Sequence, residues 1–188
     1  MIILVGASGS GKSSIAKYLE ENYDYRQIVS FTTRPPRKGE VDGKDYYFIS
    51  KERFLELKVS NFFAETAEYN GWYYGTAVTD YTSFNNRYSV AVLTPHGLRQ
   101  IKKLKDTNIA SFYIDVPRRD RLIKALERGD NIEEAYRRSL SDVGQFDGIE
   151  DEVDWVVSNP NYTKSIEEIS EEVLKDSALT LFKIVEKV

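Results

Sequence analysis

The first residues of the chain pass from a fully apolar run to a glycine- and serine-rich stretch and then to an amphipathic one. Residues 2–5 (IILV) are apolar throughout, which predicts a short buried strand. After Ser13, the apolar residues Ile15, Ala16 and Leu19 recur with the spacing of one helix face. The opening therefore predicts a strand, a glycine-rich loop and a helix, in that order.

The same two patterns recur along the rest of the chain. Further strands are predicted at residues 28–31, 62–65, 72–77, 88–93, 110–116 and 155–158. Helices are predicted at 50–58 with Ser50 as the N-cap, around 98–104, at about 119–128, at 132–146, and after the capping box formed by Ser165 and Glu168. The Asp42-Gly43 pair in front of YYFIS predicts a hairpin.

Strands and helices alternate at both ends of the chain, whereas the part between about 34 and 85 is rich in strands. Alternation predicts parallel strands that are joined by helical crossovers. In the middle part, Asn70-Gly71 separates two aromatic runs and favours an antiparallel pair. We therefore expect an α/β fold in which a small antiparallel lobe is inserted into a parallel sheet.

The composition narrows the function classes. The chain has 188 residues, 41% of them hydrophobic, which suits one domain with a sizeable core. Its net charge of -4 gives no general attraction to nucleic acid or to a membrane, and no run approaches the roughly 18 apolar residues of a membrane span. The absence of cysteine excludes disulfides, zinc thiolates and a cysteine nucleophile. Since the N-terminus has no signal-peptide pattern, we expect a cytoplasmic protein. We expect either a monomer or a homodimer.

The glycine-rich loop reads GASGSGKS and matches G-x-x-x-x-G-K-[ST] at every position. Glycines let backbone N–H groups surround a polyphosphate, and the positive end of the following helix points at it. We expect Lys12 to reach the β- and γ-phosphates of ATP, and the Ser13 hydroxyl to bind Mg²⁺. A flexible turn is the alternative, but the strand before the loop and the helix after it favour phosphate binding. The predicted ATP-binding residues here are Gly6, Ala7, Ser8, Gly9, Ser10, Gly11, Lys12, Ser13 and Ser14.

A second anion-binding segment follows in SFTTRPPRKGEVDGKDYYFIS, residues 30–50. Arg34 and Arg37 lie three positions apart on a turn stiffened by prolines, and two guanidinium forks suit one phosphate monoester. Tyr46 adds a hydroxyl donor, and a carboxylate such as Glu65, beside the hydroxyls of WYYGT, can read the N–H groups of guanine. Each feature alone fits a solvated loop or an aromatic core strand. Together, after a phosphate loop, they indicate the acceptor half of a nucleotide kinase.

With these segments in place, the sequence resembles guanylate kinases over nearly its whole length. GASGSGKSS, SFTTRPPRKGEVDGKDYYF and YYGT stand in the order and spacing of that family's motifs. The resemblance implies one domain, 1–188, with a parallel P-loop core sheet and flanking helices (1–33, 86–118 and 148–188), an inserted antiparallel lobe for a nucleoside monophosphate (34–85) and a helical lid (119–147). It also implies a transferase of purine nucleotide metabolism that phosphorylates GMP with ATP by direct transfer, with dGMP as a further candidate acceptor.

The resemblance also assigns roles to single residues. Those implied to bind GMP are Ser30, Arg34, Arg37, Glu40, Tyr46, Glu65, Tyr74, Gly75, Thr76 and Thr94. Arg128 matches an arginine of the family's lid, and Arg137 and Arg138 fall where further lid arginines occur, although strict alignment puts Ser139 at one such position. Asn159 matches a residue near the adenine of ATP. The implied catalytic residues are Lys12, Arg34, Arg128 and Arg138, with Mg²⁺ as the metal and ATP as co-substrate.

The sequence departs from the family's pattern after the strand predicted at 88–93. Val92 and Thr94 stand where the family carries aspartates. Three explanations stay open: Mg²⁺ is held by Ser13, phosphates and water alone; Thr94 bonds the base as a neutral partner; or the acceptor is not GMP. The alternatives to a GMP kinase are therefore a kinase for another phosphorylated acceptor and a non-catalytic module of the same fold that binds phosphopeptides.

Overall fold

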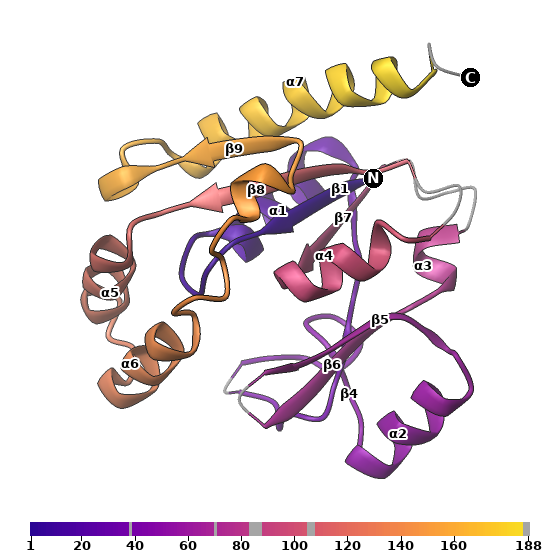
Figure 1. Cartoon of the computed structure of the whole chain (residues 1–188). Coiled ribbons are helices and arrows are strands. Elements are labelled where there is room, and N and C mark those ends of the chain that lie inside the picture. Colours follow the sequence, from indigo (N-terminus) through magenta and orange to yellow (C-terminus); the bar gives the residue numbers. More distant parts are fainter. Residues whose placement is uncertain (38, 70, 83–87, 105–107, 186–188) are drawn as a thin grey trace.

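The computed structural model describes residues 1–37, 39–69, 71–82, 88–104 and 108–185. Its main sheet has five strands in the order β2-β7-β1-β8-β9, and all neighbouring pairs are parallel (Figure 1). The strands are β1 (Ile2–Val5), β2 (Arg26–Gln27), β7 (Ser89–Leu93), β8 (Ala110–Asp115) and β9 (Trp155–Ser158). The central position of β1 explains why its sequence is apolar throughout.

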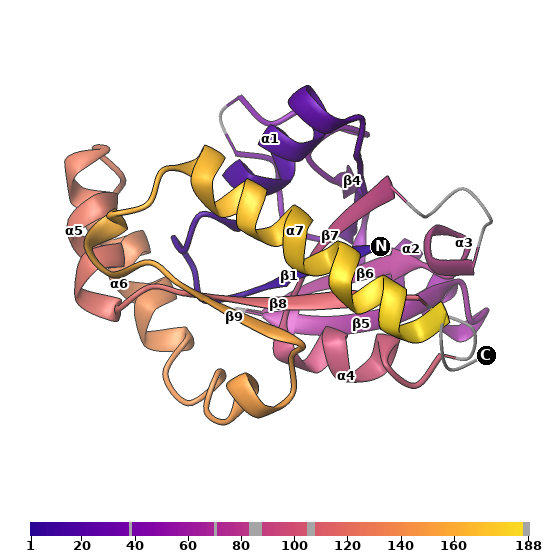
Figure 2. The same cartoon turned by 90° about the horizontal axis from the view of Figure 1, so that it is seen from above.

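Helices cover both faces of this sheet. Alternate side chains of β1 point to opposite sides, and because all of them are apolar, both faces have to be buried. Ile2 and Leu4 pack in one cluster with residues of α1 (Lys12–Tyr23) and α7 (Ile166–Val185). Ile3 and Val5 pack in the other with residues of α4 (Pro95–Ile101). All four side chains are at most 1% exposed, and Figure 2 shows α7 running across the sheet.

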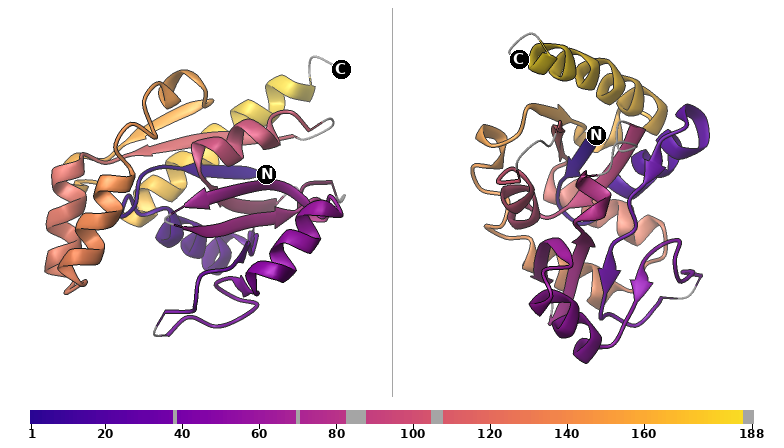
Figure 3. Two further views of the ribbon diagram at one scale, coloured as in Figure 1. Left: turned by 60° about the horizontal axis from the view of Figure 1, so that its bottom comes forward. Right: turned by 90° about the vertical axis from the view of Figure 1, so that its right-hand side faces the viewer.

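A second sheet of four strands, in the order β4-β3-β6-β5, forms a separate lobe. Its strands are β3 (Phe31–Thr32), β4 (Tyr47–Phe48), β5 (Phe63–Tyr69) and β6 (Trp72–Ala77), and β5 and β6 are antiparallel as expected. Helix α2 (Lys51–Val59) stacks its buried Phe54 on the ring of Phe63, with centroids 4.6 Å apart. Helix α3 (Thr79–Thr82) follows β6. This lobe and α7 lie at opposite ends of the molecule (Figures 1 and 3).

Helices α5 (Arg118–Glu127) and α6 (Ile132–Ser141) pack against each other and follow β8 at its carboxyl end (Figure 1). The short helices η2 (Ile149–Asp151) and η3 (Pro160–Tyr162) flank β9. Ligands of parallel α/β sheets bind beyond the carboxyl ends of the strands, so α5 and α6 stand beside the expected site. Within the described residues, no helix is both long and apolar enough to cross a membrane.

Both helix caps expected from the sequence are confirmed. The Ser50 hydroxyl accepts a hydrogen bond from the Arg53 amide at 3.1 Å at the start of α2. At the start of α7, the Ser165 amide donates to the Glu168 carboxylate at 2.7 Å, and the Glu168 amide donates to the Ser165 hydroxyl at 3.1 Å. Each cap satisfies backbone donors that the first helical turn leaves unpaired.

Three expectations about single elements are wrong. Asp42 and Tyr46 form only an isolated bridge, and β4 pairs with β3 in parallel, so there is no hairpin at Asp42-Gly43. The Asp42 carboxylate instead accepts a hydrogen bond from the Phe48 amide at 2.8 Å and closes a local turn. The strand expected at 28–31 is replaced by β2 and β3, which belong to different sheets. The helix expected at 132–146 ends at Ser141.

Candidate active site

The phosphate loop joins β1 to α1, as the sequence predicts. Gly11 immediately precedes α1 with a φ of 95°, in the left-handed region that favours glycine. At Gly6, an added Cβ would lie 2.7 Å from the Ile114 carbonyl oxygen and from Ser10 Oγ. Position 6 therefore requires glycine because other atoms approach the backbone closely there. Position 11 requires glycine because its backbone is in the left-handed region.

Lys12 curls back over this loop. Its Nζ donates to the Ala7 carbonyl at 2.9 Å and lies 3.4 Å from Ser10 Oγ. The pKa of Lys12 is lowered to about 8, chiefly by burial; the carboxylate of Asp142 opposes this fall, and the guanidinium of Arg121 adds to it. Lys12 is therefore a cation whose charge is only partly compensated before any phosphate is bound.

Three further side chains hold the loop, and the sequence reasoning did not find them. Arg121 in α5 donates from Nη1 to the Ser8 carbonyl at 3.0 Å. The Asp142 carboxylate, at the end of α6, accepts from the Ser8 amide at 2.8 Å. The Tyr162 hydroxyl donates to the Gly9 carbonyl at 2.7 Å. In the sequence these residues stand in a charged helical stretch and an ordinary loop, where no pattern separates them from solvated positions.

A cavity of about 220 Å³ lies between the phosphate loop, the lobe and the α5–α6 pair. Among the sequence-predicted residues, it is lined by Gly6, Ser8, Lys12, Ser30, Arg34, Arg37, Tyr46, Glu65, Tyr74, Thr94 and Arg138. The side chains of Arg34 and Arg37 thus face the same space as Lys12. This shared space brings the two predicted anion-binding segments together.

Arg34 is held rigidly in the lobe. Its guanidinium is paired with Glu40 through two bonds of 2.9 Å, Nη1 also donates to the Pro35 carbonyl at 2.8 Å, and the residue is 7% exposed. The guanidinium also lies over the ring of Tyr46, 5.3 Å from its centroid. A guanidinium has five N–H donors, so these three bonds leave two N–H groups for an anion in the cavity.

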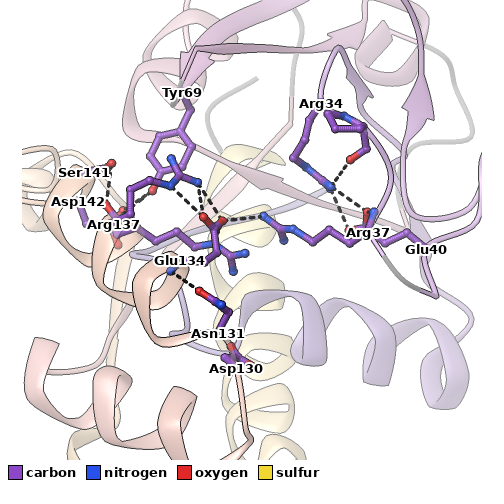
Figure 4. Close-up of polar contacts among 12 residues, drawn as sticks. Arg34, Arg37, Glu40, Tyr69, Asp130, Asn131, Glu134, Arg137, Ser141 and Asp142 are labelled. Atoms are coloured by element: carbon purple, nitrogen blue, oxygen red, sulfur yellow. Dashed lines mark hydrogen bonds and ion pairs between the residues drawn. The ribbon is translucent and has the colours of Figure 1, made fainter.

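Arg37 lies where several positive charges meet. Burial lowers the pKa of Arg37, and the neighbouring guanidiniums of Arg138 and Arg34 lower it further. The Glu134 carboxylate lies 3.7 Å from Arg37 Nη2 and also binds Arg137 (Figure 4). The same carboxylate binds Arg138. A single carboxylate shared by three guanidiniums leaves an excess of positive charge, as a phosphate site requires.

A buried polar group forms the other end of the cavity. Glu65 is 4% exposed, and its Oε1 accepts a hydrogen bond from Thr76 Oγ1 at 2.7 Å. Thr76 Oγ1 lies 3.1 Å from Ser30 Oγ. Burial raises the pKa of Glu65 to about 7, although the bond from Thr76 acts against this rise. Gly75 is needed for packing, because a Cβ there would lie 3.0 Å from the Phe63 ring.

The lid arginines differ in position. Arg138 borders the main cavity and two others. One of these is lined by Arg128 and the phosphate loop, and the other by Arg128 and Arg37. Arg137 borders only the main one of these three, and Arg128 pairs with Asp130 through Nε and Oδ1 at 2.8 Å. Ser139, at the family's arginine position, is buried and accepts from Arg118 Nε at 2.7 Å. Arg137 and Arg138 therefore both face the space that the two anion-binding segments share, and Arg138 is the one that also lies beside Arg128.

The remaining predicted residues lie outside the main cavity. Asn159 is 2% exposed, and its amide group binds the backbone of Lys164 at 3.1 and 2.9 Å, so it shapes its own loop. Gly9 and Arg128 line one of the other cavities. Ala7, Ser10, Gly11, Ser13, Ser14, Glu40, Gly75 and Thr76 border none of the three described cavities.

The side chains near the phosphate loop fit a hard cation that is bound mainly through phosphate oxygens and water. The described residues contain no group of three or more histidine and carboxylate side chains that could bind a metal ion by themselves. Ser13 is exposed in the first turn of α1, beside the loop amides. One protein hydroxyl together with phosphate oxygens and water matches the preference of Mg²⁺ for oxygen and for retained water.

A phosphate loop and a second cluster of guanidiniums on one cavity define a phosphotransferase that acts between two phosphorylated substrates. A family model described as guanylate kinase matches residues 1–176. The chain is 41% identical to the guanylate kinase of Wolinella succinogenes over 129 residues, which cover 67% of this chain and 60% of that protein. It is 34% identical to the guanylate kinase of Wolbachia pipientis wMel over 176 residues, which cover 90% and 87%.

Comparison with solved structures agrees. A crystal structure of guanylate kinase from Anaplasma phagocytophilum, 26% identical in sequence, matches with a TM-score of 0.69 over 95% of this chain and 84% of that one. The chain therefore belongs to the guanylate kinase family. The family, the α/β fold class and the enzyme class that the sequence implied are confirmed.

Proposed function

We propose that this protein transfers the γ-phosphoryl group of ATP directly to the phosphate of GMP, forming ADP and GDP. The observation that carries the proposal is the shared cavity, which both Lys12 and the Arg34–Arg37 pair line. In-line transfer requires donor and acceptor phosphates to meet within one water-poor space that is rich in positive charge. The cavity of about 220 Å³ between loop, lobe and lid supplies such a space.

In this proposal the protein contributes position and charge. Lys12 and the loop amides bind the ATP phosphates, and the two unengaged N–H groups of Arg34, with Arg37 and Tyr46, bind the GMP phosphate. Arg138 neutralises the charge that develops on the phosphoryl group in transit. Glu40 holds Arg34 in position through both of its carboxylate oxygens.

On the base side, the ionised Glu65 accepts hydrogen bonds from the N–H groups of guanine. Thr76 and Ser30 keep its carboxylate oriented through the bonds described above. Mg²⁺, bound by Ser13, phosphate oxygens and water, would neutralise charge on the phosphates. Asn159, on the loop that reaches Gly9 through Tyr162, would border the adenine.

The test is a coupled assay of ADP release with GMP, dGMP, AMP, UMP and CMP as acceptors. We expect turnover with GMP, and a loss of at least 100-fold in kcat/KM when Arg34 is replaced by Met. Arg53→Gln is the matched control, because Arg53 is an exposed arginine of the same lobe that pairs only locally with Glu56. Absence of GMP turnover would contradict the proposal.

A second candidate is a kinase for another phosphorylated acceptor. Val92 and Thr94 line the cavity in place of carboxylates, and the Thr94 hydroxyl already accepts the Gly97 amide at 3.1 Å as the cap of α4. Among the described residues that line the cavity, Glu65 and Asp142 are the only carboxylates. A base with fewer N–H donors than guanine would suit this edge better. Preference for another nucleotide in the same panel would support this candidate.

A further inference from the structure

A buried carboxylate from the end of α6 contacts the phosphate loop. Asp142 caps the end of α6, is 8% exposed, and lines the same cavity as Lys12. Its Oδ2 accepts the Ser8 amide at 2.8 Å and lies 3.1 Å from Arg121 Nη1. Its position is therefore fixed by one backbone donor of the loop and one cation of α5.

The surroundings of this carboxylate are those of a bound anion. The Ser8 amide and the Arg121 guanidinium converge on one oxygen, Asp142 Oδ2, and Arg121 also donates to the Ser8 carbonyl at 3.0 Å. The negative charge of Asp142 acts on Lys12 and opposes the fall of its pKa. From the lobe, the Tyr69 hydroxyl points toward Asp142 Oδ1 at 3.4 Å (Figure 4). Loop, lid and lobe thus all contact a single carboxylate.

This arrangement conflicts with the entry of a triphosphate. A terminal phosphate that binds the Ser8 amide would lie beside Arg121, and the Asp142 carboxylate, which already occupies both donors, repels it. A carboxylate with a purely structural role would be expected outside the cavity, where it would not repel the phosphates of a substrate. Asp142 instead lines the space in which the two phosphates must meet.

We propose that Asp142 is an internal anion that competes with the terminal phosphate of ATP for the phosphate loop and for Arg121. It lowers the affinity of the protein for a triphosphate relative to a diphosphate, and its carboxylate moves away from the Ser8 amide when ATP is bound. The inference rests on the proposed function only in assuming that this loop binds ATP.

The experiment is Asp142→Asn, with the dissociation constants of ATP and ADP measured by calorimetry at equal MgCl₂ and without GMP. A pH of 6.5 keeps Lys12 protonated, since its pKa is about 8. Asparagine keeps the shape and one acceptor but removes the charge. We expect ATP to bind threefold to tenfold more tightly and ADP to change less than twofold. Glu133→Gln, an exposed carboxylate of the same helix, should change neither constant.

Unchanged or weaker ATP binding by the variant, or an equal gain for both nucleotides, would overturn the inference. A measurement on the unmodified chain covers the case in which the variant does not fold. There the competing carboxylate predicts that ATP and ADP bind within threefold of each other, and ATP binding tighter than ADP by tenfold or more would overturn the inference. Intact ATP binding without GMP turnover would contradict the proposed function alone.

Discussion

Replacing Glu65 by glutamine tests both the base site and the energetics of the lobe. Glu65 is 4% exposed, and its one recorded side-chain bond is the one from Thr76 at 2.7 Å. Glutamine has the same shape and can still accept this bond through its carbonyl oxygen. The substitution therefore removes the charge and little else.

The magnitude follows from the pKa. Burial raises the pKa of Glu65 from 4.5 to about 7, and each unit corresponds to about 1.4 kcal/mol, so ionised Glu65 lowers the free energy of unfolding by about 3 kcal/mol. Because the pKa in the folded chain lies above that in the unfolded chain, the folded state keeps its proton at pH values where the unfolded state has lost it. Stability should therefore fall as pH rises from about 4.5 to 7.

The assay is urea unfolding of both proteins at pH 5 and pH 8. The stability of Glu65→Gln relative to the original chain should rise by about 2 to 3 kcal/mol between these two pH values. Glu68→Gln, an exposed carboxylate of the same strand, is the control and should show no such rise. A relative stability of Glu65→Gln that does not change with pH would refute the reasoning.

The same charge should govern GMP binding. Guanine N–H groups need the ionised carboxylate, so the KM for GMP should fall as pH rises from 6 to 8. A charged hydrogen bond contributes about 1.5 to 3 kcal/mol, so Glu65→Gln should raise this KM by about 10- to 100-fold and remove the pH dependence. A stable variant with impaired GMP binding would show that the carboxylate is kept for recognition at the expense of stability.

Three further predictions concern the phosphate end. Lys12→Met should lower turnover at least 100-fold yet raise the urea midpoint of the free chain. The pKa of Lys12, lowered from 10.5 to about 8, means that its charge lowers the free energy of unfolding by about 3 kcal/mol. Loss of the bond to Ala7 partly offsets this gain in stability. Arg138→Met should lower kcat by about 10²- to 10³-fold and Arg137→Met by less than tenfold in the same steady-state assay, since Arg138 is the less exposed of the two and also lines the cavities beside Arg128. Tyr162→Phe should lower the free energy of unfolding by about 1 kcal/mol and raise the KM for ATP with little change in kcat, because it removes the 2.7 Å bond to the Gly9 carbonyl.

Sequence patterns predicted the core sheet well, because burial of each strand and helix leaves a pattern within its own few residues. The apolar run at β1 and the helical spacing of Ile15 and Leu19 depend only on burial on both sides of a parallel sheet, and the structure has both. The hairpin predicted at Asp42-Gly43 was wrong for a reason that the sequence does not show. An aspartate side chain can replace a strand partner by bonding the Phe48 amide, and nothing in the residue order distinguishes the two.

The candidate site divides in the same way. Loop, arginine pair and Glu65 could be predicted because each is a motif whose chemistry lies in adjacent residues. Arg121 and Asp142 could not, since their role arises only when α5 and α6 fold back over Ser8, more than a hundred positions away in the chain. Ser139 shows the converse: it stands at an expected arginine position, but it is buried, accepts a hydrogen bond from Arg118 and does not line the main cavity.

The cations of the cleft already have partners in the chain, and this sets how phosphates can bind. The recorded pairs are Arg34 with Glu40, Arg37 and Arg138 with Glu134, Arg121 with Asp142, and Arg128 with Asp130. Lys12 differs, because its recorded hydrogen-bond partners in the described chain are a carbonyl and a hydroxyl, and burial lowers its pKa. A buried cation without a counter-charge is strongly destabilising, so internal carboxylates keep the nucleotide-free cleft stable. Binding of ATP and GMP then exchanges one anion for another, and affinity depends on the difference between them. Removing Asp142, whose carboxylate occupies an amide of the phosphate loop, should therefore strengthen phosphate binding. Removing Glu40, which holds the Arg34 guanidinium in position, should weaken it.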